Sequence, residues 1–242
     1  YKTTMQQQIQ PENAVHRIRA ITLDLDDTLW EIGPVICRAE EILWSWLDEH
    51  YPRIHEKYSA SDLARMRRDV VDAHRERNFD FRFLRKKVLE MVAIGAGYSE
   101  SLVEPAFGVF DDARNEVELY PDVLVELERL SSRFTVVALT NGNSNLETIG
   151  IRHLFHSVVT ATDVGVAKPD KRIFDVAVGK IGVAPGEILH VGDDPETDID
   201  GARQAGFRTA WINRNGDQWP ADVIAPDAIV NDMTDLRKLL EG

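Results

Sequence analysis

The stretch ITLDLDDTLW, residues 21–30, places three aspartates at the end of a run of apolar residues. The apolar character of residues 18–25 predicts a strand that is buried on both faces. Asp24, Asp26 and Asp27 therefore stand at the carboxyl end of a buried strand, although like charges held close together repel one another. Such acids are tolerated where a cation neutralises them or where some of them keep a proton.

The second half of the sequence alternates apolar runs with helical patterns. Strands are predicted for FTVVALTNG (134–142), HSVVTA (156–161), EILHVGDD (187–194) and RTAWINR (208–214). Helices are predicted near residues 122–132, 144–150, 170–181 and 197–205. This alternation predicts an α/β fold with a doubly wound parallel sheet.

Residues 33–116 show only helical periodicity, and Ser61 is the expected N-cap of the second helix in this block. A segment of this length with helices of its own predicts an inserted all-helical domain. The first strand needs neighbours from the second half of the chain to be buried on both faces. We therefore expect one α/β domain from residues 1–32 and 117–242, in which the polar residues 1–17 form a loose arm.

The composition limits the classes of function. The chain has 242 residues and a formal net charge of −13, so we expect no nucleic-acid partner. No apolar run approaches the roughly 20 residues that span a bilayer, and residues 1–17 lack the apolar core of a signal peptide. Cys37 is the only cysteine, which excludes an internal disulfide, and we expect a cytoplasmic protein with no membrane partner.

Polar residues stand at or near the ends of the predicted strands. Because ligands bind outside the carboxyl ends of the strands in open parallel sheets, we expect these residues to meet on one rim. They are Asp24, Asp26, Thr140, Asn141, Lys168, Asp193, Asp194 and Asp198. A single Asp or Asn in such a place is more often a helix cap, but several acids on one rim favour a Mg²⁺ site, since Mg²⁺ prefers carboxylate and water oxygens.

The lysine and the threonine on this rim suggest phosphoryl transfer. Lys168 supplies a cation among acids, and a metal, a lysine and a hydroxyl around a carboxylate can stabilise a transferring phosphoryl group. An aspartate can act as the nucleophile and form an aspartyl-phosphate. A second acid two residues later could donate a proton to the leaving oxygen and later accept one from water.

Four motifs, in this order, resemble those of the haloacid dehalogenase (HAD) superfamily. DLDDTL (24–29) matches the first motif, DxDxT, and LTNG (139–142) matches the second, a hydrophobic strand that ends in Thr or Ser. The lysine of AKPD (167–170) matches the third motif, and GDDPETD (192–198) matches the fourth, GDxxxxD. The inserted helices resemble the C1 cap of this superfamily, so the resemblance implies a HAD-like Rossmannoid core with a helical cap.

The resemblance implies a catalytic role for each residue that matches a motif. Asp24 is the implied nucleophile, and Asp26 is the implied acid and base. Thr140, Asn141 and Lys168 are implied to bind the phosphoryl group, with the Asn141 backbone amide beside Thr140 and with Lys168 also holding the nucleophile. Together these roles describe a phosphomonoesterase that works through an aspartyl-phosphate.

The resemblance also implies a set of Mg²⁺ ligands. Asp24, the backbone carbonyl of Asp26 and Asp193 are implied to bind the ion directly. Asp194 and Asp198 are implied to bind the metal or its waters. We expect Mg²⁺ as the cofactor.

Several stretches, among them GPVICRAE (33–40), resemble a bacterial branch of C1-capped phosphatases. That branch hydrolyses FMN and the riboflavin-pathway intermediate 5-amino-6-(5-phospho-D-ribitylamino)uracil. A flat ring could stack on an aromatic side chain in or near the cap, and Trp30, just after the first motif, is the best candidate. We therefore expect a small phosphorylated metabolite as the substrate of a monomer or homodimer.

Other functions stay open. Nucleoside monophosphate and sugar phosphate phosphatases share the same motifs. A 2-haloacid dehalogenase is less favoured, because the dehalogenases of the superfamily lack the acid that Asp26 supplies, since a halide leaves without a proton. A phosphoacceptor switch and a non-catalytic phosphate-binding protein are disfavoured, the first by the large insert and the second by the intact Asp24, Asp26, Lys168 and Asp193.

Overall fold

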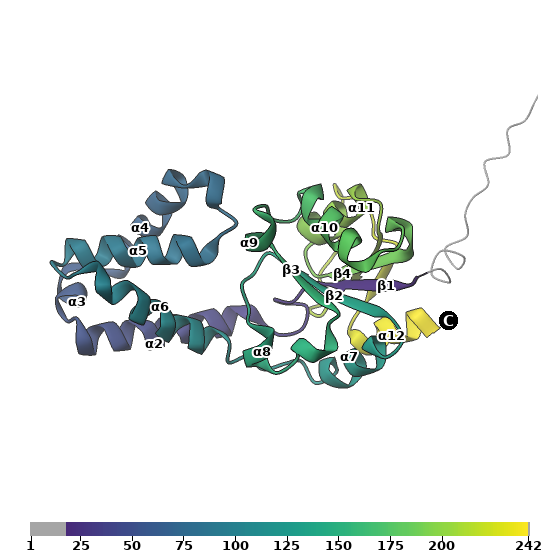
Figure 1. The fold of residues 1–242 in the computed structure, drawn as a ribbon, viewed down its shortest axis with the longest axis horizontal. Helices are drawn as coiled ribbons and strands as arrows, with labels where there is room; N and C mark the ends of the chain where they lie inside the picture. Colours follow the sequence, from purple (N-terminus) through teal and green to yellow (C-terminus); the bar gives the residue numbers. More distant parts are fainter. Residues whose placement is uncertain (1–17, 242) are drawn as a thin grey trace, which may run out of the picture.

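The computed structural model describes residues 18–241, so the loose arm predicted for residues 1–17 lies outside the described residues. Figure 1 shows a sheet flanked by helices at one end of the molecule and a group of helices, α2 to α6, at the other. No helix within residues 18–241 is long and apolar enough to cross a bilayer.

The strands form a parallel sheet in the order β3-β2-β1-β4-β5-β6. Their bounds are β1 Ala20–Leu23, β2 Thr135–Thr140, β3 Ser157–Thr160, β4 Ile188–Gly192, β5 Arg208–Ile212 and β6 Ala228–Val230. β1 lies at the centre, where Leu23 is in register with Ala138 of β2 and Val191 of β4. The predicted doubly wound parallel sheet is therefore confirmed, and β6 is a strand that the sequence pattern did not indicate.

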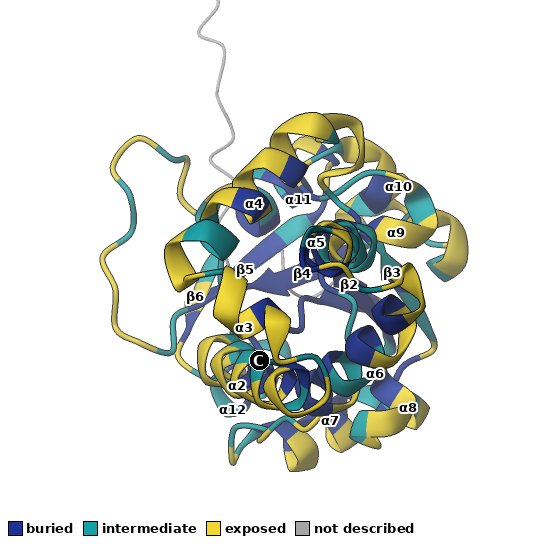
Figure 2. Ribbon diagram, turned by 90° about the vertical axis from the view of Figure 1, so that its left-hand side faces the viewer, coloured by how far each residue is buried: buried dark blue, intermediate teal, exposed yellow. Residues whose placement is uncertain are grey.

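Helices cover both faces of the sheet, as Figures 1 and 2 show. On one face pack α7 Val123–Ser131, α8 Leu146–Ile149 and α12 Met233–Glu241, and on the other pack α9 Ala161–Val164, α10 Lys171–Ile181 and α11 Gly201–Gln204. Successive side chains of a strand point to opposite faces. Ile21 and Leu23 of β1 accordingly join one hydrophobic cluster, whereas Ala20 joins the other.

The remaining helices form the inserted cap. They are α2 Ile32–His50, α3 Arg53–Lys57, α4 Ala60–Ala73, α5 Phe81–Gly95 and α6 Val103–Arg114. Short 3₁₀ turns lie at Arg75–Arg77, Glu100–Leu102, Arg152–Leu154 and Pro185–Glu187, and a π turn lies at Pro195–Asp200. The cap has a hydrophobic cluster of its own, to which Leu43, Val92 and Phe107 belong.

The N-cap predicted for the second cap helix was wrong by two residues. Ser59, and not Ser61, precedes α4, and its hydroxyl accepts a hydrogen bond from the backbone N–H of Asp62. The Asp62 carboxylate in turn accepts the backbone N–H of Ser59 at 3.0 Å. This reciprocal pair satisfies two N–H groups that the helix cannot bond internally, which explains why the helix begins there.

The cap and the sheet are in contact at several points. α2 begins directly after the loop that follows β1, and its Val35 packs in a cluster of the sheet. At the far end of the cap segment, the Asn115 side chain accepts the backbone N–H of Asn145 at 2.7 Å. Phe79, in the turn between α4 and α5, packs against the other sheet cluster. The domain limits at residues 32/33 and 116/117 stay a prediction.

Candidate active site

A buried lysine joins two acids at the carboxyl edge of the sheet. Asp24 directly follows β1, and its backbone N–H donates to the Val191 carbonyl at 2.9 Å. Lys168 Nζ donates to Asp24 Oδ1 at 2.5 Å and to Asp198 Oδ1 at 2.6 Å. The three side chains are 10% exposed or less. Three segments far apart in the sequence therefore meet at one ammonium group.

Electrostatic interactions favour the charged forms of Lys168 and Asp198 and the neutral form of Asp24. Burial by itself lowers the pKa of Lys168, but attraction to Asp198 and Asp24 outweighs it, so the pKa is raised and the ammonium persists. Burial raises the pKa of Asp198, but Lys168 and a hydrogen bond from His190 hold it below its usual range. The pKa of Asp24 is raised well above its usual value by burial and by the nearby Asp198 and Asp193.

Asp198 is fixed from three sides. Its Oδ1 also lies 3.0 Å from His190 Nε2, and its Oδ2 accepts the backbone N–H of Asp194 at 3.1 Å. His190 is fully buried, and its Nδ1 lies 2.8 Å from Thr22 Oγ1. A Cβ at Gly192 would stand 2.3 Å from Asp198 Cγ, so only glycine fits under this carboxylate. Asp198 thus holds Lys168 in place.

Asp193 completes a cluster that suits a divalent cation. Single carboxylate oxygens of Asp24, Asp193 and Asp198 all lie within 4.8 Å of one another. Thr28 Oγ1 donates to Asp193 Oδ1 at 3.3 Å, and burial, with repulsion from Asp198 and Asp27, raises the pKa of Asp193 to about 7. Raised pKa values of clustered acids mark a place where a cation would be bound strongly. The donor set therefore fits Mg²⁺.

Asp26 has surroundings unlike those of Asp24. Its Oδ1 accepts the indole N–H of Trp30 at 3.0 Å, and its Oδ2 lies 3.4 Å from Nη2 of Arg114, at the end of cap helix α6. Burial raises the pKa of Asp26, although Arg114 and Trp30 act in the opposite direction. A carboxyl whose pKa is raised holds its proton to a higher pH than usual and can donate it.

The loop after β2 closes the site. Thr140 is 1% exposed, and its Oγ1 accepts the backbone N–H of Gly142 at 2.9 Å, which leaves its hydroxyl hydrogen free to donate. The Asn141 side chain pairs with the backbone of Lys168 through bonds of 2.7 and 3.1 Å. A Cβ at Gly142 would stand 2.4 Å from Asp26 Oδ2, so glycine is required for this close approach.

A model of the haloacid dehalogenase-like hydrolases matches residues 18–206 of this sequence. The chain belongs to the haloacid dehalogenase-like hydrolases. This family is the one that the four sequence motifs resembled, and the residues of all four motifs lie on the rim described above.

Relatives in this hydrolase family cover most of the chain. The 5-amino-6-(5-phospho-D-ribitylamino)uracil phosphatase YigB of Escherichia coli (strain K12) is 34% identical over 83% of this chain and 86% of its own. A glyceraldehyde 3-phosphate phosphatase of Methanopyrus kandleri is 32% identical, with coverage of 81% and 84%. A crystal structure titled 2-haloacid dehalogenase, from Pseudomonas syringae pv. Tomato DC3000, superposes with a TM-score of 0.88, at 35% identity and coverage of 93% and 98%.

One residue of this hydrolase differs from its predicted role. Trp30 was predicted to stack on a substrate ring, but its side chain is fully buried in the sheet cluster, so no ligand can lie on it. Its indole instead orients Asp26. Asp194 caps the turn that follows it, because its Oδ1 accepts the backbone N–H groups of Glu196 and Thr197 at 2.9 and 2.7 Å. The predicted contact of Asp194 with the metal or its waters stays a prediction.

The structure also adds residues that sequence reasoning missed. Arg114 is 3% exposed, contacts Asp26 and donates to Ser144 Oγ at 2.5 Å. His190 lies in a predicted strand, but its contact with Asp198 was not predicted. Neither residue lies in a motif that indicates chemistry, and both act through partners that only the fold brings near.

Proposed function

We propose that this protein hydrolyses the phosphate monoester of a small metabolite through an aspartyl-phosphate, with Mg²⁺ as cofactor. The observation that carries the proposal is the environment of Asp26, a carboxyl with a raised pKa that two N–H donors orient two residues after the nucleophile. Phosphatase relatives over most of the chain support phosphoric monoester hydrolysis.

The proposed reaction has two steps. In the first, an Asp24 oxygen forms a bond to phosphorus while the bond from phosphorus to the alcohol oxygen breaks, and Asp26 gives its proton to that oxygen. In the second, water attacks phosphorus and loses a proton to Asp26, which releases phosphate and regenerates Asp24. The Lys168 ammonium and the Thr140 hydroxyl are placed to bind the phosphoryl oxygens, where charge builds up during transfer.

The residues that would hold the cofactor are Asp24 and Asp193, with Asp198 in reach and the Asp26 carbonyl as the further ligand expected from the family resemblance. Bound Mg²⁺ would neutralise charge on the phosphoryl oxygens and on the acids. Asp24, Asp193, Asp198 and Lys168 together carry two net negative charges when all are ionised, which a divalent cation balances.

Dehalogenation of a 2-haloacid is the second candidate function, because the similar crystal structure from Pseudomonas syringae is described as a 2-haloacid dehalogenase. A halide leaves without a proton, so a dehalogenase has no use for an oriented acid beside its nucleophile. Here Trp30 and Arg114 both bond to Asp26, and Gly142 leaves room for it. These contacts favour the phosphatase.

For the substrate, we propose FMN or 5-amino-6-(5-phospho-D-ribitylamino)uracil. The resemblance of the sequence and the name of the Escherichia coli relative both support this choice. A nucleoside monophosphate or a sugar phosphate is the alternative, since relatives are named for pyrimidine nucleotides and for glyceraldehyde 3-phosphate.

Phosphate release tests the proposal. The protein is assayed with and without Mg²⁺ on FMN, the ribitylaminouracil phosphate, nucleoside monophosphates and sugar phosphates, and fluoride or chloride release is measured from 2-haloacids. We expect Mg²⁺-dependent phosphate release that Asp24→Asn abolishes and Asp69→Asn, at an exposed position on α4, leaves intact. Halide release without phosphate release, or an active Asp24→Asn variant, would contradict the proposal.

A further inference from the structure

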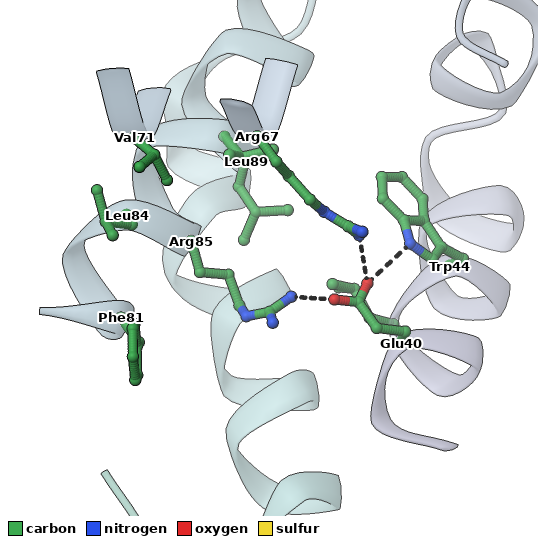
Figure 3. Close-up of a pocket in the computed structure, with 10 residues that line it drawn as sticks. Glu40, Trp44, Arg67, Val71, Phe81, Leu84, Arg85 and Leu89 are labelled. Carbon is green, nitrogen blue, oxygen red and sulfur yellow. Dashed lines mark hydrogen bonds and ion pairs between the residues drawn. The ribbon is translucent and has the colours of Figure 1, made fainter. Parts of the chain in front are cut away.

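A carboxylate that accepts several hydrogen bonds can serve the fold alone, as one in the cap illustrates. Glu40 of α2 accepts hydrogen bonds from Arg67 and Arg85 at 2.8 and 2.5 Å, and it also accepts the Trp44 indole N–H at 3.0 Å. Figure 3 shows these donors converging on Glu40 in the wall of a pocket between cap helices. Among residues 18–241, none of these side chains hydrogen-bonds to the rim, so this group ties α2, α4 and α5 together.

Asp198 on the rim also accepts several hydrogen bonds, but one of its partners is a histidine. Its Oδ1 accepts a bond from Lys168 Nζ at 2.6 Å, and its Oδ2 accepts the backbone N–H of Asp194 at 3.1 Å. His190 Nε2 lies 3.0 Å from the same Oδ1. An ammonium and a backbone N–H can only donate, so both oxygens of Asp198 are acceptors. The contact with His190 is therefore a hydrogen bond only when Nε2 carries the ring proton.

The other side of the imidazole favours the same position of the proton. Thr22 and His190 are register partners on β1 and β4, and Thr22 Oγ1 lies 2.8 Å from His190 Nδ1. Both side chains are fully buried, and burial lowers the pKa of His190, so the ring is neutral and has one N–H. The Thr22 hydroxyl can donate to Nδ1, which leaves that proton on Nε2. Thr22 and Asp198 therefore select the same tautomer.

The buried imidazole reaches the rim only through Asp198. A hydroxyl, an imidazole and a carboxylate in line are also the parts of a hydrolase triad, but Thr22 and His190 are fully buried and neither can touch a substrate. Phe174 of α10 covers the ring edge-on, with the two ring centroids 5.5 Å apart. The bond from Asp198 to Lys168 then carries the orientation of this group to the reacting atoms.

We propose that His190 is a positioning residue of the reaction, whose Nε2–H holds Asp198 in the orientation that keeps the Lys168 ammonium against Asp24. This role rests on the proposed function, in which Lys168 binds the phosphoryl oxygens. Lys168 Nζ divides its bonds between Asp198 at 2.6 Å and Asp24 at 2.5 Å. Without the bond from His190, the Asp198 carboxylate can turn and the ammonium moves with it. A displacement of about 1 Å costs up to about 10²-fold in rate.

Two substitutions of His190 separate positioning from packing in the core. The amide nitrogen of glutamine lies as many bonds from Cβ as Nε2 of histidine does, so His190→Gln can still donate to Asp198. The amide nitrogen of asparagine lies only as far from Cβ as Nδ1, so His190→Asn leaves Asp198 without this donor. Both variants put an amide in the same buried place, and both disturb the packing. If His190 only packs, the rate does not depend on which amide is present.

The kinetic experiment measures kcat and KM for FMN with Mg²⁺, at a temperature at which thermal unfolding shows every variant to be folded. We expect kcat/KM to fall by about tenfold or more in His190→Asn and to stay within about threefold of wild type in His190→Gln. Equal losses in the two variants, or no loss in His190→Asn, would overturn the proposal.

Thr209→Val is the control for lost stability. Thr209 is the register partner of His190 on β5, is similarly buried, and its hydroxyl bonds to Asp227. The variant therefore removes a buried hydrogen bond beside His190 and leaves the bond from His190 to Asp198 in place. We expect it to lower Tm and to leave kcat/KM unchanged. A loss of kcat/KM in Thr209→Val as large as that in His190→Asn would assign the effect to stability and overturn the proposal.

Two measurements without turnover separate this proposal from the proposed function. NMR of the metal-free protein with ¹⁵N-labelled histidine shows which nitrogen of His190 carries the proton, and the His190→Gln spectrum identifies its signals. We expect the proton on Nε2. Calorimetric titration of the full chain with inorganic phosphate, in the presence of Mg²⁺, reports the placement of Lys168, and we expect His190→Asn to bind about fivefold more weakly than wild type and His190→Gln.

If wild type releases no phosphate from any ester, the proposed function fails and these two measurements decide the role of His190. A proton on Nδ1 of His190 in wild type would refute the role, because Nε2 would then have nothing to donate to Asp198. Equal phosphate binding in wild type and His190→Asn, or no binding to wild type, would refute it as well.

Discussion

Replacing Arg114 with methionine tests whether the cap sets the proton affinity of the acid in the active site. Arg114 is nearly buried, so methionine fills a similar volume and removes the positive charge beside Asp26. Without that charge, ionised Asp26 is less favoured, and the pKa of Asp26 rises. Because Asp26 must hold a proton in the first step of the proposed reaction, activity should fall as pH rises through this pKa. The alkaline limb of the pH profile should therefore move to higher pH.

The size of the shift follows from the distance between the two charges. Arg114 Nη2 lies 3.4 Å from Asp26 Oδ2. Two unit charges about 4 Å apart interact by about 4 kcal/mol at an effective dielectric constant of about 20, which corresponds to an upper limit of about 3 pH units. The Asp26 side chain is 22% exposed, so water screens the pair, and we expect the limb to move by about 1–2 pH units.

The assay is kcat/KM for FMN with Mg²⁺ between pH 5 and pH 10. Arg82→Met is the matched control, because Arg82 is another cap arginine in an ion pair, with Asp111 at 2.6 Å. Its alkaline limb should move much less. Thermal unfolding of both variants checks that each one folds. An alkaline limb that stays in place in Arg114→Met, or that moves to lower pH, would refute the reasoning.

Three further changes probe the rim. Gly142→Ala should lower kcat about 10²-fold, because its Cβ would stand 2.4 Å from Asp26 Oδ2, whereas Gly179→Ala, with open space around the new Cβ, should leave phosphate release unchanged. Lys168→Met should lower the free energy of unfolding by about 3–5 kcal/mol in urea titrations, because it leaves two buried carboxylates without their cation. An unchanged urea midpoint would argue against the ion pairs of Lys168 with Asp24 and Asp198. The pKa of Asp193 is raised to about 7, so the metal-free protein should lose stability from this group as pH rises from about 4 through 7. Mg²⁺ should then raise Tm more at pH 8 than at pH 5, and a larger effect at pH 5 would contradict this sign.

The rim could be predicted from the sequence because each strand that supplies it is a short apolar run with polar residues at its end. Parallel pairing then places those ends at one edge, wherever the segments lie in the chain. β1 and β4 illustrate this, since Asp24 and Asp198 share one lysine although 174 positions separate their residue numbers. β6 escaped prediction because it has only three residues, fewer than a periodic pattern needs.

Side-chain direction was harder to predict than element order. Trp30 lies next to the first motif, and nothing in its local sequence distinguishes a ring that faces a ligand from one that is buried. The isolated bridges that pair Trp30 with Asp26 and Leu119 turn the indole inward. The contact of Arg114 with Asp26 was harder still to predict. The two residues are 88 positions apart in the sequence, and the motifs do not specify where the cap lies relative to the sheet.

In the proposed reaction Asp24 and Asp26 need opposite proton states, and their surroundings provide a way to separate them. In the protein without metal, burial raises the pKa of both Asp24 and Asp26, so burial alone does not distinguish the nucleophile from the acid. Asp24 shares its oxygens with Lys168 and with the cluster that fits a divalent cation, and a cation there would lower its pKa. The Asp26 carboxylate lies outside that cluster, so burial would keep its pKa raised against the opposing effect of Trp30 and Arg114. Metal binding would thus make Asp24 the nucleophile and leave Asp26 as the acid.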